Sequence, residues 1–92
     1  MRRYCPIGDM RKEVLYFATA MERELKENDF KGGWEDCNLP FLLDKLVEEL
    51  KEFRRAIADY PSKPGKVLSE GADVANIVMM ICDITSDDEE TK

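Results

Sequence analysis

The chain has 92 residues, of which 43% are hydrophobic, and a formal net charge of −6. This length allows one domain, and the hydrophobic content suffices for a core, which argues against global disorder. The negative charge argues against a nucleic-acid polymer or an anionic membrane as the main partner, although bridging metal ions still permit a nucleotide ligand. The sequence contains no histidine, so histidine-based acid–base catalysis is excluded.

The sequence shows neither a targeting signal nor a pattern of structural cysteines. No apolar run approaches the roughly 18 residues of a membrane span. The basic N-terminus leads into no apolar signal region. Cys5, Cys37 and Cys82 fit neither a disulfide framework nor a zinc spacing. We therefore expect a reduced, cytoplasmic protein.

Apolar residues at helical spacing predict a first helix over Asp9–Asn28 and a second from about Asn38 to Asp59. Paired glycines in the segment 31–34 break the pattern between them, because they favour a loop. Asn38 is a good N-cap residue, and Pro40 is tolerated in the first turn of a helix. The apolar face of the second helix carries Leu43, Leu46, Leu50, Phe53 and Ile57.

A third helix is predicted over Lys66–Ile84, after a turn with two prolines and a glycine at 60–65. From Val74 onward it is apolar nearly all round, so it must be covered on several sides. Two neighbours within the chain are too few, and we expect a homodimer or homotetramer with this helix near the interface. The prediction is an all-α domain over residues 1–84, a helical bundle completed by homo-oligomerisation, with a frayed acidic tail at 85–92.

Two acidic clusters carry the functional argument. Glu48, Glu49 and Glu52 form the pattern E-E-x-x-E, and seventeen residues separate them from Glu70-x-x-Asp73. Residues three or four apart share a helix face, so two packed helices can aim these carboxylates into one volume. Without a cation, carboxylates this close together repel one another strongly. With Mg²⁺ between them, their oxygens become metal ligands. A solvated face explains the first cluster and the helix dipole explains Glu70, but neither explains Asp73 on the apolar side of its helix.

This arrangement resembles the MazG-like all-α nucleoside triphosphate pyrophosphohydrolases, which carry E-E-x-x-E followed by E-x-x-D at a similar distance. Lys45 and Lys66 match the lysines that precede the two clusters in that family. The resemblance spans about Gly32 to Asp83 and is to the short, single-domain members found in phage and mobile gene cassettes. It implies hydrolysis between the α- and β-phosphates of a nucleoside triphosphate, with Mg²⁺, or Mn²⁺ as a substitute, as cofactor.

The resemblance also implies roles for individual residues. Glu48 would activate water or help to hold a second metal ion. Lys45 and Lys66 would contact phosphates. The implied metal ligands are Glu49, Glu52, Glu70 and Asp73.

Two further residues have alternative interpretations. Trp34 is either a loop anchor or an aromatic platform for the nucleobase. Asn76 either makes a buried polar contact between subunits or binds the sugar or base, and we favour the ligand. The expected role is removal of unwanted nucleotides from the pool. The rival hypotheses are a non-enzymatic acidic helical interaction module and the same scaffold acting on dUTP or phosphoribosyl-ATP.

Overall fold

The computed structural model describes the backbone of residues 6–27 and 33–90 and the side chains of 6–27 and 33–86. Over these residues it contains three α-helices, α1 (Lys12–Glu27), α2 (Leu39–Asp59) and α3 (Pro64–Glu90), a short 3-10 helix η1 (Ile7–Asp9), and no strand. The all-α prediction is therefore confirmed for the described part of the chain. Several parts of the sequence predictions lie outside it: the basic N-terminus with Cys5, Asn28, residues 31–32 of the predicted loop, and residues 91–92 of the predicted tail.

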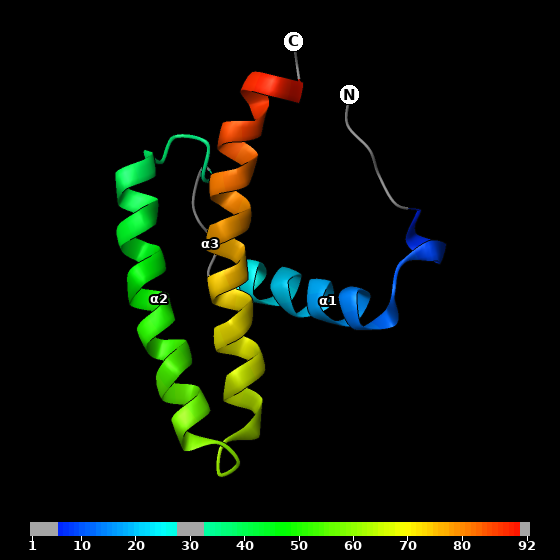
Figure 1. The fold of residues 1–92 in the computed structure, drawn as a ribbon, viewed down its shortest axis with the longest axis vertical. Helices are drawn as coiled ribbons and strands as arrows, with labels where there is room; N and C mark the ends of the chain where they lie inside the picture. Colours follow the sequence, from blue (N-terminus) through cyan, green and yellow to red (C-terminus); the bar gives the residue numbers. More distant parts are fainter. Residues whose placement is uncertain (1–5, 28–32, 91–92) are drawn as a thin grey trace.

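The helices form an antiparallel hairpin with a third helix laid across it. In Figure 1, α2 and α3 run side by side, and α1 crosses near the middle of α3. The C-terminal part of α1 meets the hairpin, whereas its first turn projects away from it. None of the helices in the described ranges is long and apolar enough to cross a membrane.

The start of α2 follows the sequence prediction. The Asn38 side-chain oxygen accepts a hydrogen bond from the backbone N–H of Phe41 at 2.8 Å, which satisfies one of the free donors of the first turn. Pro40 lies in that turn, where its missing N–H costs nothing. The predicted N-cap is therefore confirmed. The helix ends at Asp59, also as predicted.

The ends of α3 differ from the prediction. It begins at Pro64, two residues before the expected start, because proline is well suited to the first helical position. It continues to Glu90, beyond the expected end at Ile84, so residues 85–90 are helical where the sequence predicted a tail outside the helix. No glycine or proline follows Ile84 to stop the helix. The Thr85 hydroxyl also stays within the helix, donating to the Ile81 carbonyl at 2.9 Å.

The core lies between α2 and α3. Leu42, Ile77 and Met80 are its buried centre, and Leu25 of α1 packs against them. Ala20 of α1 and Ala72 of α3 are small, buried residues on the helix faces that carry Glu24 and Asn76, one turn before each. The crossing of α1 and α3 brings an acidic residue of α1 next to the acids of α3.

The apolar belt of α3 is partly covered within the chain. Its members are Val74, Ile77, Val78, Met79, Ile81 and Cys82. Of these, only Val78 and Cys82 are exposed, because α1 and α2 pack on different sides of the helix. Ile77 is buried, and Val74, Met79 and Ile81 are half-buried, so α1 and α2 cover this belt only in part. A larger exposed apolar surface runs along α2, which we call the α2 stripe: Leu39, Leu43, Val47, Leu50 and Ile57.

Candidate metal site

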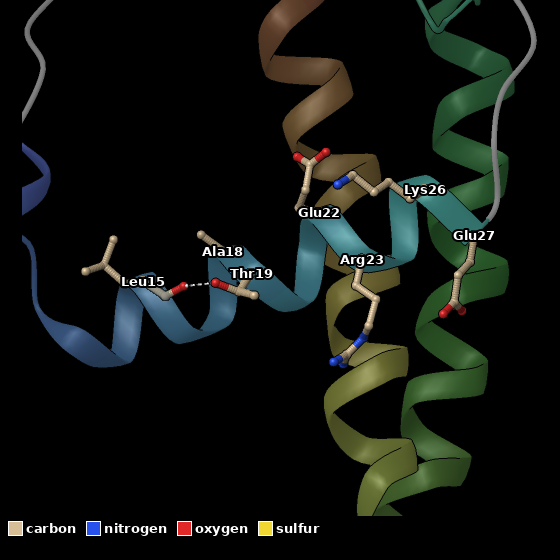
Figure 2. Close-up of a pocket in the computed structure, with 7 residues that line it drawn as sticks. All are labelled: Leu15, Ala18, Thr19, Glu22, Arg23, Lys26 and Glu27. Carbon is tan, nitrogen blue, oxygen red and sulfur yellow. Dashed lines mark hydrogen bonds between the residues drawn. The ribbon is translucent and has the colours of Figure 1, made fainter.

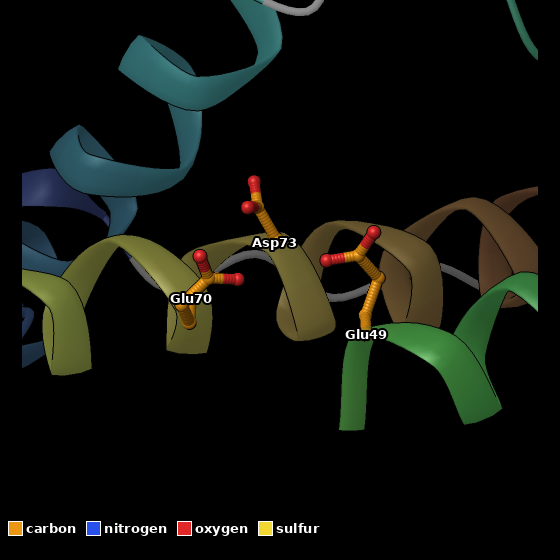
Figure 3. Close-up of side chains that lie close together, drawn as sticks. All are labelled: Glu49, Glu70 and Asp73. Atoms are coloured by element: carbon orange, nitrogen blue, oxygen red, sulfur yellow. The ribbon is translucent and has the colours of Figure 1, made fainter. Parts of the chain in front are cut away.

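Three carboxylates from two helices converge beside the hairpin seam. Glu49 of α2 and Glu70 and Asp73 of α3 each offer an oxygen, and these three oxygens lie within 4.8 Å of one another. Figure 3 shows Glu49 reaching toward the two acids on α3, with Asp73 directed toward α1. We call these three residues the acidic triad. Each of them is half-buried.

The spacing of the triad suits a small divalent cation. Ligand oxygens on Mg²⁺, with bonds of about 2.1 Å, lie at most about 4.2 Å apart. The oxygens of the triad lie within 4.8 Å of one another, so an approach of roughly 0.6 Å would bring them into this range. Carboxylate oxygens are also the ligands that Mg²⁺ and Mn²⁺ prefer. The residues present therefore fit the expected metal.

Both predicted lysines lie beside the triad. The Lys66 ammonium forms an ion pair with Glu70 at 3.2 Å across one turn of α3. Lys45 stands one turn before Glu49 on α2, and its positive charge favours the charged form of that acid. The lysines thus stand at the edge of the acid cluster, where each can also meet an anionic ligand.

Two of the predicted acids are not part of the triad. Successive residues on a helix point about 100° apart, so Glu48 turns away from α3 when Glu49 faces it, and it is exposed. Glu52 is next to Glu49 on α2, but its carboxylate accepts hydrogen bonds from Arg55 at 3.1 and 3.2 Å. Its side chain is half exposed.

The structure places Trp34 away from the triad. Its indole N–H donates to the carboxylate of Asp83 at 3.0 Å, and the ring packs against the core. Asp83 follows Asp73 by ten residues, which is about 15 Å along a helix. This geometry is that of a loop anchor, the first of the two interpretations of Trp34.

Asn76 lies on the seam between α1 and α3. It is buried, and its side-chain amide donates to the backbone carbonyl of Met21 at 3.0 Å. Within the described structure, its side-chain oxygen is buried without a hydrogen-bond partner. In this arrangement Asn76 joins two helices of the same chain.

Glu24 is the acidic neighbour that the sequence reasoning missed. It lies on α1, is 9% exposed, and shares a side-chain hydrogen bond with Asp73. A signal was present in the sequence, because Glu24 follows Phe17 by seven residues and Met21 by three, which places it on the apolar face of α1. An acid on that face is costly to bury without a partner, which marks it as a site candidate.

Burial and mutual repulsion make the acids harder to ionise. The pKa of Asp73 is raised to about 7, first because burial penalises its charged form and then because of the charges of Glu24, Glu49 and Glu70. The hydrogen bond with Glu24 raises it further. Burial also raises the pKa of Glu49, although Lys45 partly opposes this effect. A divalent cation would relieve the repulsion in both cases.

We predict that the metal-free protein loses stability as the pH rises. The pKa of Asp73 is higher in the folded state than its ordinary 3.8, so the folded state holds this proton more tightly. The resulting stabilisation is complete below 3.8 and is lost as the pH rises through about 7. Denaturant unfolding in the presence of a chelator, from pH 5 to pH 8, measures this loss. Asp73→Asn should flatten the dependence, and an unchanged dependence in that variant would contradict the prediction.

Two hollows in the described part of the molecule lack such a cluster of acids. Figure 2 shows the one on the outer face of α1, of about 600 Å³, which is lined by two acids, Glu22 and Glu27, and two bases, Arg23 and Lys26. The other is an apolar groove of about 420 Å³, and its lining includes Phe17, Phe53 and Val74 but no charged residue. The acidic triad is therefore the strongest candidate site in the described part of the molecule.

Comparisons with known proteins do not assign this chain to a family. No protein-family model matches it, and no curated protein or solved structure is significantly similar to it. The functional argument therefore rests on the residues and their geometry.

Proposed function

We propose that this protein is a Mg²⁺-dependent nucleotide pyrophosphohydrolase that converts a (deoxy)nucleoside triphosphate and water into the monophosphate and pyrophosphate. The observation that carries the proposal is the convergence of Glu49, Glu70 and Asp73, with lysines at the edge. Carboxylates brought this close are strongly unfavourable unless a cation or protons offset their charge. A polyphosphate bound through Mg²⁺ supplies that cation and meets the lysines with its own negative charge.

The residues of the site divide the work between them. The acidic triad would hold Mg²⁺ or Mn²⁺. When bound, this ion would neutralise negative charge on the phosphate oxygens. Lys45 and Lys66 would contact the phosphates, with Lys66 exchanging its ion pair with Glu70 for one with the substrate. By the family resemblance, Glu48 would activate the attacking water and Glu52 would complete the metal ligands. The proposed role is the removal of unwanted nucleotides from the cytoplasmic pool.

The rival hypotheses differ in what they explain. A non-enzymatic acidic interaction module accounts for the net charge and for the exposed α2 stripe, but it gives no reason for half-buried acids facing each other across a helix seam. Hydrolysis of dUTP or phosphoribosyl-ATP would use the same acidic triad, so those substrates belong in the same test. The position of the acids favours an enzyme.

Product analysis tests the proposed reaction directly. The purified chain is incubated with Mg²⁺ and a panel of nucleoside and deoxynucleoside triphosphates, dUTP and phosphoribosyl-ATP included. We expect the monophosphate and pyrophosphate as direct products, with orthophosphate only after a pyrophosphatase is added. Nucleoside diphosphate with orthophosphate would contradict the assigned bond cleavage, and no turnover of any substrate would favour the interaction module.

We also propose that the chain works as a homodimer or homotetramer. The support is the α2 stripe, whose members are 42–56% exposed and recur along one side of α2. Fully burying one such side chain is worth about 1.5–3 kcal/mol, so a second copy covering the stripe would gain considerable stability. A chain of this size also buries only a modest core by itself. The proposed interface is therefore on α2, whereas the sequence alone placed it on the third helix.

A further inference from the structure

Glu24 is an unusual residue for the position it occupies. It is one of two polar or charged residues that are buried in the described part of the chain, together with Asn76. It contacts the site from α1, a helix that contributes none of the acids recognised in the sequence pattern. Its hydrogen bond is to Asp73, a member of the acidic triad. Packing alone does not explain a buried acid here, since an apolar side chain would fill the position at lower cost.

The surroundings of Glu24 hold it in a defined place. One turn before it on α1, the carbonyl of Met21 accepts a hydrogen bond from Asn76 at 3.0 Å. Asn76 in turn stands three residues after Asp73 on α3. The hydrogen bonds between Asn76 and Met21 and between Glu24 and Asp73 therefore join the same segments of α1 and α3. Together they fix how the two helices lie against each other.

Glu24 stands behind the triad and is not one of its members. The three mutually close oxygens belong to Glu49, Glu70 and Asp73. Figure 3 shows Asp73 directed toward α1, the helix that carries Glu24. Two carboxyl groups form a hydrogen bond only through a shared proton, and in the metal-free protein the bond favours that proton on Asp73. With a metal ion bound, Glu24 would hold the proton, so that one oxygen of the ionised Asp73 would accept the hydrogen bond while the other binds the ion. Groups that bond to ligands in this way orient them, and their loss typically costs about 10–100-fold in metal affinity.

We propose that Glu24 is a positioning residue of the metal site, which bonds to Asp73 from α1 and turns the Asp73 carboxylate toward Glu49 and Glu70. This inference rests on the proposed metal-dependent function. It adds a residue from a third helix to the site and gives α1 a role in it. Metal affinity should then depend on a hydrogen-bonding group at position 24 and not on a second negative charge there.

The test compares two substitutions of similar volume in the full chain. Glu24→Gln keeps a side chain that can donate a hydrogen bond to Asp73, and Glu24→Met removes it. Glu22→Met is the matched control, since Glu22 is exposed on the outer face of the same helix (Figure 2). The dissociation constant of Mn²⁺ alone is measured by calorimetric titration without nucleotide. We expect the Gln variant and the control within about threefold of wild type, and the Met variant weaker by about 10–100-fold.

Each other outcome has a defined meaning. Equal losses in the Gln and Met variants would overturn the inference, because the charge of Glu24 would then be what matters. Wild-type affinity in the Met variant would also overturn it and leave the proposed function standing. A wild-type chain that binds no Mn²⁺ would overturn the metal site and this inference together. If circular dichroism shows that the Met variant is unfolded, Glu24→Asp, which withdraws the carboxyl group by one methylene, is expected to show the loss instead.

Discussion

The Glu49→Gln variant should lose at least about 100-fold in kcat/KM on whichever triphosphate the product assay identifies, and Asp73→Asn should lose as much. Each change removes the charge of a proposed metal ligand, and metal stabilisation of a transition state is worth several kcal/mol, with about 1.4 kcal/mol for each tenfold in rate. Steady-state assays at saturating Mg²⁺ measure the effect. Circular dichroism checks that the fold survives, which we expect because both residues are only half-buried.

Glu52→Gln is the informative comparison for these variants. The family resemblance makes Glu52 a metal ligand, whereas the structure turns its half-exposed carboxylate toward Arg55. We therefore expect less than about a tenfold loss, on the scale of an outer group that only supports a ligand. A loss as large as that of Glu49→Gln would show that the first cluster binds the metal as the sequence pattern implies. Full activity in Glu49→Gln would instead remove the proposed site.

Leu50→Asp should convert the assembled protein into a monomer of about 10.6 kDa. Leu50 lies in the middle of the α2 stripe, and its side chain is 47% exposed within one chain. An aspartate there would bury an unpaired charge if a second copy covered the stripe, which costs more than the contact gains. Light scattering at micromolar concentration measures the mass of wild type and variant. The single chain should stay folded, because the position is open to solvent.

Val78→Asp distinguishes the two candidate interfaces. Val78 is 43% exposed on α3, the helix that the sequence alone placed at the interface. If the α2 stripe is the contact, this variant keeps the mass of the wild type. Dissociation by Val78→Asp but not by Leu50→Asp would move the interface to α3. A wild-type monomer that is fully active would show that assembly is not needed for the reaction.

The sequence determined the local features of this protein. Helical spacing of apolar residues predicted three helices, and the Asn38 cap and the end of α2 at Asp59 followed from side-chain chemistry within a few residues. The pairing of Glu70 with Asp73 on one face of α3 was also readable, because it depends only on the pitch of one helix. The unexpected length of α3 has a local cause too, namely the absence of a breaking residue after Ile84.

The tertiary structure decided which of these residues meet. Glu48 and Glu49 lie about 100° apart around α2, with Glu52 between them, and only the rotation of α2 against α3 selects Glu49 for the triad. The approach of Glu24 to Asp73 depends on where α1 crosses α3, a relation between distant segments that no local pattern encodes. The hydrogen bond from Trp34 to Asp83 and the packing of α1 and α2 on the apolar belt of α3 also depend on how distant segments are placed. Helix periodicity is a property of neighbouring residues, whereas the packing angle of two helices is set by all the side chains between them.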